Sequence, residues 1–95
     1  MMEIKIKKLT GSFAENKDSA RSIRLTKIIP ALEKKECIIL DFAGVDGATQ
    51  SFIHALISDV MRKYGADVLD RISFKNCNET VKKIISIVVD YMQES

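Results

Sequence analysis

The hydrophobic pattern changes its period several times along the first third of the chain. Apolar and charged residues alternate from Met2 to Lys7, and this period of two predicts a strand with one face in water. From Asp18 the apolar positions fall on one helical stripe, and Asp18 or Ser19 is placed to cap the helix N-terminus. Pro30 lies inside this stripe, so we expect either a kink or a new turn that begins at the proline.

The middle of the chain holds a short apolar run, a polar segment and a long amphipathic segment. Residues 37–40 are continuously apolar and end at Asp41, which predicts a central strand covered on both faces. A polar loop follows as far as Gln50. Apolar residues then recur at helical spacing over residues 52–64, with a broad face to bury, and Gly65 is placed to end that helix.

The last third predicts one more strand and one more helix. Residues 68–74 are expected to form the strand, and Asn76 to Asn78 supply caps for the helix that follows. The resulting order is β-α-β-α-β-α, which predicts an α/β fold with a small mixed, mostly parallel sheet and alternating helices. Ligands and regulatory contacts gather at the carboxyl ends of such strands. We therefore expect the 41–51 loop to be the functional region.

Composition narrows the class of protein. With 95 residues, 46% of them hydrophobic and 29% charged, the chain is expected to fold as a single globular domain over residues 1–95. Its 15 basic and 13 acidic residues are spread along the sequence, so no nucleic-acid partner is predicted. No apolar stretch approaches the roughly 20 residues of a membrane span. No signal peptide is evident either, and we expect a cytoplasmic protein without a membrane partner.

Three short runs of the sequence resemble a known family. The runs "ILDFAGV" and "TQSFIHAL", followed later by "ISFKNCNETVKKII", are similar to the STAS-like domains, small bacterial relatives of the anti-sigma-factor antagonists. The resemblance extends over about residues 11–89. It implies a STAS-like fold and a non-catalytic role in signalling.

The same resemblance gives one serine a special place. In the antagonist branch the matching strand also ends in Asp, and the next helix begins with Asp-Ser-Ser-Gly, whose second serine is phosphorylated. Counted from Asp41, that serine corresponds to Ser51, while Thr49 and Phe52 replace the acidic residue and the glycine. The resemblance thus implies Ser51 as a phosphorylation candidate whose neighbours differ from those of the antagonists.

The residues themselves leave several roles open at this loop. Ser51 stands where a helix begins, so its hydroxyl is placed to cap the helix, to carry a phosphate, or to help hold a free anion. Asp41 is expected to accept hydrogen bonds from backbone N–H groups of residues 44–47. No nucleophile, base and orienting group can be assembled from the sequence, so we predict no catalytic residue, no metal site and no cofactor.

Two functional hypotheses follow. The first is a regulatory protein-interaction module whose docking candidates all lie in the loop and at the start of the next helix: Asp41, Gly44, Asp46, Thr49, Gln50 and Ser51. The resemblance implies a histidine-kinase-type ATPase as its partner; whether the chain also forms a homodimer is left open. The alternative is a ligand- or phosphate-binding domain or enzyme subunit, which requires Asp41, Asp46 and His54 to converge.

Overall fold

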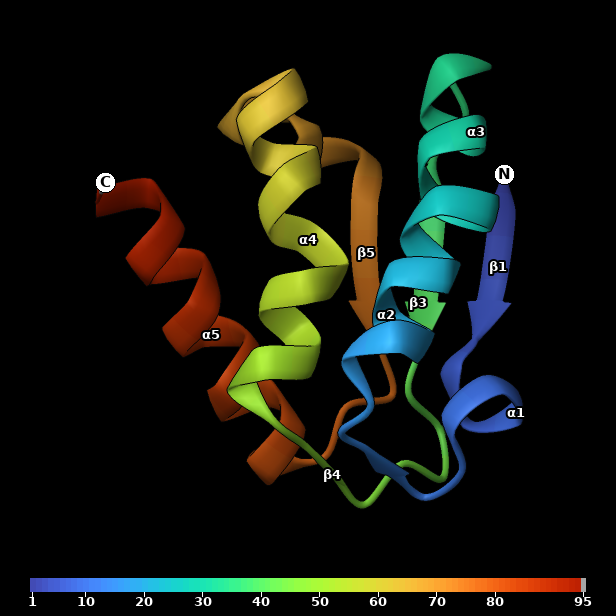
Figure 1. Cartoon of the computed structure of the whole chain (residues 1–95), viewed down its shortest axis with the longest axis vertical. Coiled ribbons are helices and arrows are strands. Elements are labelled where there is room, and N and C mark those ends of the chain that lie inside the picture. Colours follow the sequence, from blue (N-terminus) through green and yellow to red (C-terminus); the bar gives the residue numbers. More distant parts are fainter. Residues whose placement is uncertain (95) are drawn as a thin grey trace.

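A three-stranded parallel sheet forms the centre of the computed structural model, which describes residues 1–94 (Figure 1). Its strands, β1 (Met2–Lys5), β3 (Ile38–Asp41) and β5 (Ile72–Lys75), are ordered β1-β3-β5. Ile4 pairs with Leu40, and Leu40 pairs in turn with Phe74. The predicted α/β class and the central position of the strand predicted over residues 37–40 are confirmed, and the observed strand is shifted by one residue to Ile38–Asp41.

Helices cover one face of this sheet. In Figure 1 the helical column α2-η1-α3 and helix α4 stand in front of the strands, and α5 flanks α4 on its outer side. The helical segments in chain order are α1 (Ile6–Thr10), α2 (Lys17–Ile23), the π-helix η1 (Arg24–Ile28), α3 (Ile29–Glu33), α4 (Gln50–Tyr64), the 3-10 helix η2 (Ala66–Arg71) and α5 (Glu79–Glu94). None of the described helices is both long enough and apolar enough to cross a membrane.

The π-helical turn explains how the first long helix accommodates Pro30. A proline within a helix lacks an N–H group, and its ring crowds the carbonyl four residues earlier, here that of Thr26. The backbone widens over η1, and the Thr26 hydroxyl donates to the Ser22 carbonyl at 2.6 Å. Pro30 then stands in the first turn of α3, where no N–H is needed. The helix runs from η1 into α3 without a break and α3 begins at Ile29, so the expected new turn beginning at Pro30 is not observed, and the π-helical turn accommodates the proline instead.

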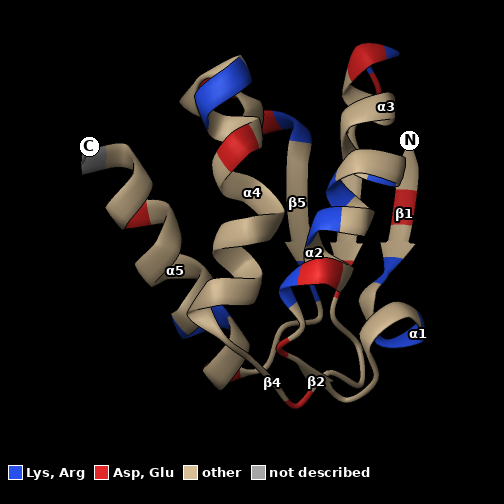
Figure 2. Ribbon diagram, viewed as in Figure 1, with Lys and Arg blue, Asp and Glu red and all other residues tan. Residues whose placement is uncertain are grey.

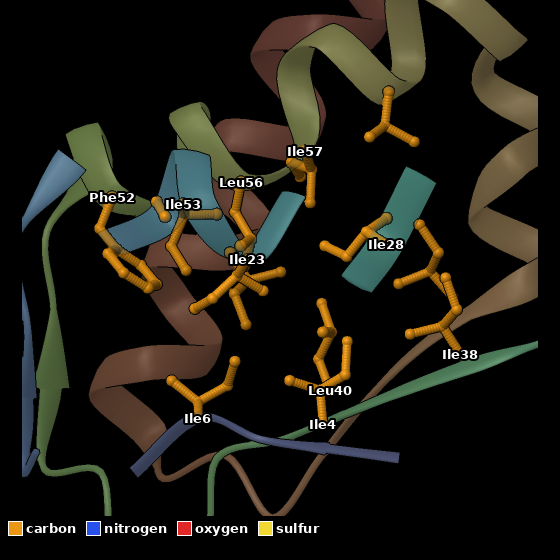
Figure 3. Packing of buried hydrophobic residues seen from close by; sticks show 14 of the residues in the cluster. Ile4, Ile6, Ile23, Ile28, Ile38, Leu40, Phe52, Ile53, Leu56 and Ile57 are labelled. Carbon is orange, nitrogen blue, oxygen red and sulfur yellow. The ribbon is translucent and has the colours of Figure 1, made fainter. Parts of the chain in front are cut away.

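The hydrophobic core lies between the sheet and the helices. Ile4, Ile38 and Leu40 of the strands point toward Ile23, Ile28, Leu56 and Ile57 of the helices (Figure 3). Phe52, Leu56 and Val60 are fully buried on one side of α4, as the helical spacing predicted. Gly65 ends this helix with φ of 84°, a left-handed conformation that favours glycine.

The opposite face of the sheet is open, so the expectation that the central strand is covered on both faces is wrong. Residues paired across a parallel sheet share a face, and the row Glu3, Ile39 and Ser73 lies opposite the core. Glu3 and Ser73 are exposed and Ile39 is half-buried. The apolar character of Ile39 made the run look symmetrical, although only alternate residues of the strand face the helices.

Three element boundaries also differ from the sequence predictions. The first strand ends at Lys5, and Ile6 instead begins α1. The cap of α2 is Asn16, whose side chain accepts from the N–H groups of Asp18 and Ser19. Those two residues were predicted to be caps themselves, but they stand two and three residues after the observed cap.

The third strand is shorter than predicted. Most of the 68–74 segment belongs to η2, and only residues 72–75 pair with β3. Arg71 holds η2 in place, because its guanidinium donates to the carbonyls of Leu32 and Glu36 at 3.1 and 3.2 Å. Both acceptors lie more than 30 residues away in the sequence, so a local pattern could not predict this turn.

Candidate functional site

The 41–51 loop lies at the carboxyl end of the central strand, as expected, and it is braced by a second small sheet. Strand β4 (Gly47–Ala48) pairs in parallel with β2 (Phe13–Ala14). Backbone bonds extend the pairing on both sides, from the Asp46 N–H to the Ser12 carbonyl at 2.7 Å and from the Thr49 N–H to the Ala14 carbonyl at 3.0 Å. The segment predicted to be only loop is therefore held by regular backbone pairing.

Asp41 fixes the start of the loop. Its Oδ1 accepts from the Ala43 N–H at 2.9 Å and from Asn76 Nδ2 at 3.0 Å, and its Oδ2 lies 4.0 Å from Lys5 Nζ. The expected contacts with N–H groups of residues 44–47 do not form, because the chain turns immediately after Phe42 and presents Ala43 first. Asp41 therefore ties the loop to the turn that follows β5.

Hydrogen bonding also sets the acidity of Asp41. The bond from Asn76 holds the pKa of the Asp41 carboxyl below its ordinary value, and the backbone bond from Ala43 adds to this effect. Burial opposes the shift, while Lys5 and Lys75 reinforce it. The carboxyl is thus held as an anion that organises the loop. It carries no proton near neutral pH and is therefore unsuited to act as a general acid.

We expect the stability of the fold to fall in acid through this carboxyl. A pKa lowered by folding gives a contribution that is complete above the unfolded value of about 3.9 and is lost as the pH falls through the folded value. Urea midpoints measured from pH 6 down to pH 2 should fall less in Asp41→Asn than in wild type. Asn76→Ala should give an intermediate slope. Parallel profiles for all three proteins would contradict this role for Asp41.

Two glycines shape the middle of the loop. Gly44 has φ of 80°, and the aliphatic part of Lys7 lies where its side chain would stand, with Cδ 2.6 Å from an ideal Cβ. At Gly47 the ring of Phe13 occupies that place, with Cε1 at 2.7 Å. Gly44 is required for backbone conformation, whereas Gly47 lets an aromatic ring lie against the chain.

The turn after β5 supplies two asparagines, predicted only as helix caps. Asn78 fulfils that prediction, because its Oδ1 accepts from the Val81 N–H at 2.8 Å. Its Nδ2 also donates to the Asp46 carbonyl at 2.8 Å. Asn76 instead bonds Asp41. Together they attach both ends of the 41–46 segment to the start of α5, a role that sequence reasoning missed.

At the start of α4, the residue that caps the helix is a different one from Ser51. Thr49 is the cap, and its Oγ1 accepts from the Phe52 N–H at 3.1 Å. Gln50 and Ser51 form the first turn, and both are exposed. The hypothesis that Ser51 caps the helix is therefore wrong, since Thr49 has taken that position. The Ser51 hydroxyl faces solvent beside the positive end of the helix.

A groove of about 490 Å³ opens beside Ser51. Its walls are the first turns of α4, with Ser51 and His54, and the second half of α5, with Ile87 and Tyr91. Lys17 at the start of α2 also lines it. We refer to this hollow as the Ser51 groove.

The structure does not bring together the three residues of the alternative hypothesis. His54 is half-buried in the Ser51 groove. Asp41 is engaged with Asn76, and Asp46 is exposed on the loop; neither lines the groove. Among residues 1–94, no three His, Cys, Asp or Glu side chains lie close enough to share a metal ion.

One largely buried arginine, which was not singled out from the sequence, is bonded to a residue of α4 that lines the groove. Arg24 Nη1 donates to the Ala55 carbonyl at 2.6 Å and lies 3.3 Å from Asp59 Oδ2. Its side chain is 11% exposed, whereas Arg62, which contacts the same aspartate, is 61% exposed. Arg24 thus joins the π-helical turn to the middle of α4.

Comparison with known proteins identifies one family. A sequence model of the family described as a STAS-like domain of unknown function (DUF4325) matches residues 19–82. The matched segment contains β3, the loop, α4, β5 and the beginning of α5. No curated protein and no solved structure gave a significant match.

Proposed function

The chain belongs to the STAS-like domain family, and on this basis we propose that it is a non-catalytic cytoplasmic regulatory module that docks a protein partner. The docking surface is the 41–51 loop together with the exposed first turns of α4. The candidates Asp46, Gln50 and Ser51 are exposed there, while Asp41 and Thr49 shape the surface from beneath. The partner is a histidine-kinase-type ATPase, as the resemblance to the antagonists implies.

The exposure of Ser51 carries this proposal. A serine that begins a helix usually serves the helix itself, but here Thr49 makes the capping bond. Ser51 can therefore be modified without loss of the cap. A phosphate at this position would add a charge of about −1.5 to −2, which the N-terminal end of the helix tolerates. Its main effect would fall on whatever binds beside it.

Rigid support for the loop favours docking over catalysis. The loop is attached to β2 and to the asparagine turn, so a partner would meet a preformed surface and pay little ordering entropy. Asp41, the most buried acid of the site, is already held by two hydrogen bonds. Among the residues that the structure describes, no aspartate or glutamate lines the groove beside Ser51 to pair with His54.

The test compares variants of Ser51 as bait in the source cells. Ser51→Ala should recover at least as much ATPase as wild type, of which a fraction is phosphorylated, and Ser51→Asp should recover about tenfold less than Ser51→Ala, because the added charge lies in the interface. Intact mass of the protein purified from the same cells should report one added phosphate on wild type and none on Ser51→Ala. Melting temperatures of Ser51→Ala and Ser51→Asp should stay close to wild type.

Two controls separate binding from folding. Ser22→Asp places the same charge on an exposed position of α2, away from the loop, and should bind normally. Thr49→Ala removes the true cap and should lower the free energy of unfolding by about 0.5–2 kcal/mol. Equal recovery of the ATPase by Ser51→Ala and Ser51→Asp would refute the switch, and recovery of no ATPase would refute the partner assignment.

A further inference from the structure

The Ser51 groove has an apolar floor and one apolar wall. Ala55 of α4 and Val88 of α5 lie along its base. Ile87 and Tyr91 stand one helical turn apart on α5 and are 40% and 59% exposed. Large apolar side chains left this accessible, side by side and next to a hollow, are typical of surfaces that bind another protein.

One charged side chain lines the groove. Among the described residues, Lys17 is the lysine in its lining, which contains no aspartate or glutamate. The helices contribute long uncharged stretches to the walls, residues 50–58 of α4 and 84–89 of α5, and both stretches are visible in Figure 2. Lys17 makes no ion pair with the rest of the described chain. A bound group that carries a carboxylate would supply that partner.

We propose that the Ser51 groove binds an amphipathic helix of the partner protein that carries carboxylates beside its apolar stripe. The walls are too open to enclose a small molecule, which usually loses 70–90% of its surface to a pocket. A helix can instead place apolar side chains at positions i and i+4 against Ile87 and Tyr91 while a glutamate reaches Lys17.

This inference rests on the proposed function and adds a physical reason why a phosphate on Ser51 weakens the binding of the partner. Ser51 lines the same groove as Lys17. A phosphate on Ser51 therefore places negative charge where the acidic helix must lie, and like charges at an interface strongly disfavour binding. Phosphorylation then acts by closing the groove to an acidic ligand, with no change of fold required.

A matched pair of designed peptides tests the chemistry directly. Both peptides form amphipathic helices with an apolar stripe of leucines spaced alternately three and four residues apart. One peptide carries glutamate on its remaining faces, and the other carries lysine there. Fluorescence anisotropy should give an affinity at least about tenfold higher for the glutamate peptide. Amide chemical shifts should change at the start of α4 and in the second half of α5.

Variants of the protein locate the site. Ile87→Asp and Lys17→Glu should each weaken the glutamate peptide about tenfold, and Ser51→Asp should do the same. Ser86→Asp is the control for Ile87→Asp, since it adds the same charge at the preceding position of α5, which is exposed and does not line the groove. Lys27→Glu is the control for the second. Both controls should bind as wild type does.

Specific outcomes would overturn the proposal. Equal affinity for the two peptides would remove the acidic specificity. Shifts confined to the hollow beside β1, which is lined by Lys5, Lys8 and Lys27, would assign the binding elsewhere. If the glutamate peptide fails to bind while Ser51→Asp still releases the ATPase in cells, the groove assignment is wrong and the regulatory function stands.

Discussion

Replacing Phe42 with alanine is expected to lower the free energy of unfolding by about 3–5 kcal/mol. Phe42 is fully buried directly after the central strand, and its ring lies 6.4 Å from that of Phe74. Its N–H donates to the Lys75 carbonyl, and its own carbonyl accepts from Val45. The truncation would leave a cavity beneath the loop, and a domain of this size has only about 5–15 kcal/mol in total.

Urea unfolding followed by circular dichroism gives the stability loss of Phe42→Ala. Phe13→Ala is the matched control, because the same truncation at a ring that is 49% exposed should cost several-fold less. Phe42→Leu should keep most of the stability by refilling part of the volume. A loss under about 1 kcal/mol in Phe42→Ala would mean that the loop does not depend on this anchor.

The Leu56→Ala variant should lose about 2–5 kcal/mol, because its side chain is fully buried between α4 and the sheet. At roughly 4–8 °C per kcal/mol for a domain of this size, the melting temperature should fall by about 10 °C or more. Scanning calorimetry measures both quantities.

Leu25 provides the control for Leu56. It carries the same side chain on a helical segment but is 49% exposed, so Leu25→Ala should stay within about 0.5 kcal/mol of wild type. A loss of that small size for Leu56→Ala would show that the predicted face of α4 is not the one that packs against the sheet.

Local sequence patterns were sufficient to predict the elements that are determined by residues close together in the sequence. Helix α4 was visible because its apolar spacing, its polar start and Gly65 all agree. The central strand was visible from residues 37–40, although periodicity alone did not reveal that the Ile39 side faces away from the helices. Asn78 was predicted as a cap from its position alone, and the structure confirms it.

Tertiary contacts decided the rest. Residues 68–71 form η2 because Arg71 reaches the end of α3, a contact that no local window contains. The pairing of β2 with β4 joins segments more than 30 residues apart through four residues in all, too few for a recognisable pattern. The Ser51 groove likewise combines the start of α2 with the end of α5. The sequence pointed to Ser51 as a functional residue, but it did not predict the apolar wall that α5 places beside it.

The contact between Phe13 and Gly47 links two positions that are distant in the sequence. Residue 13 lies outside the segment matched by the family and residue 47 lies within it. Any side chain at position 47 would push the ring outward into solvent, and a small residue at position 13 would free position 47 for alanine or serine. Among relatives we therefore expect these two positions to covary, with glycine at 47 wherever 13 is aromatic. An alignment restricted to the matched segment would show whether position 47 is always glycine. It would not show that the residue at position 13 determines this.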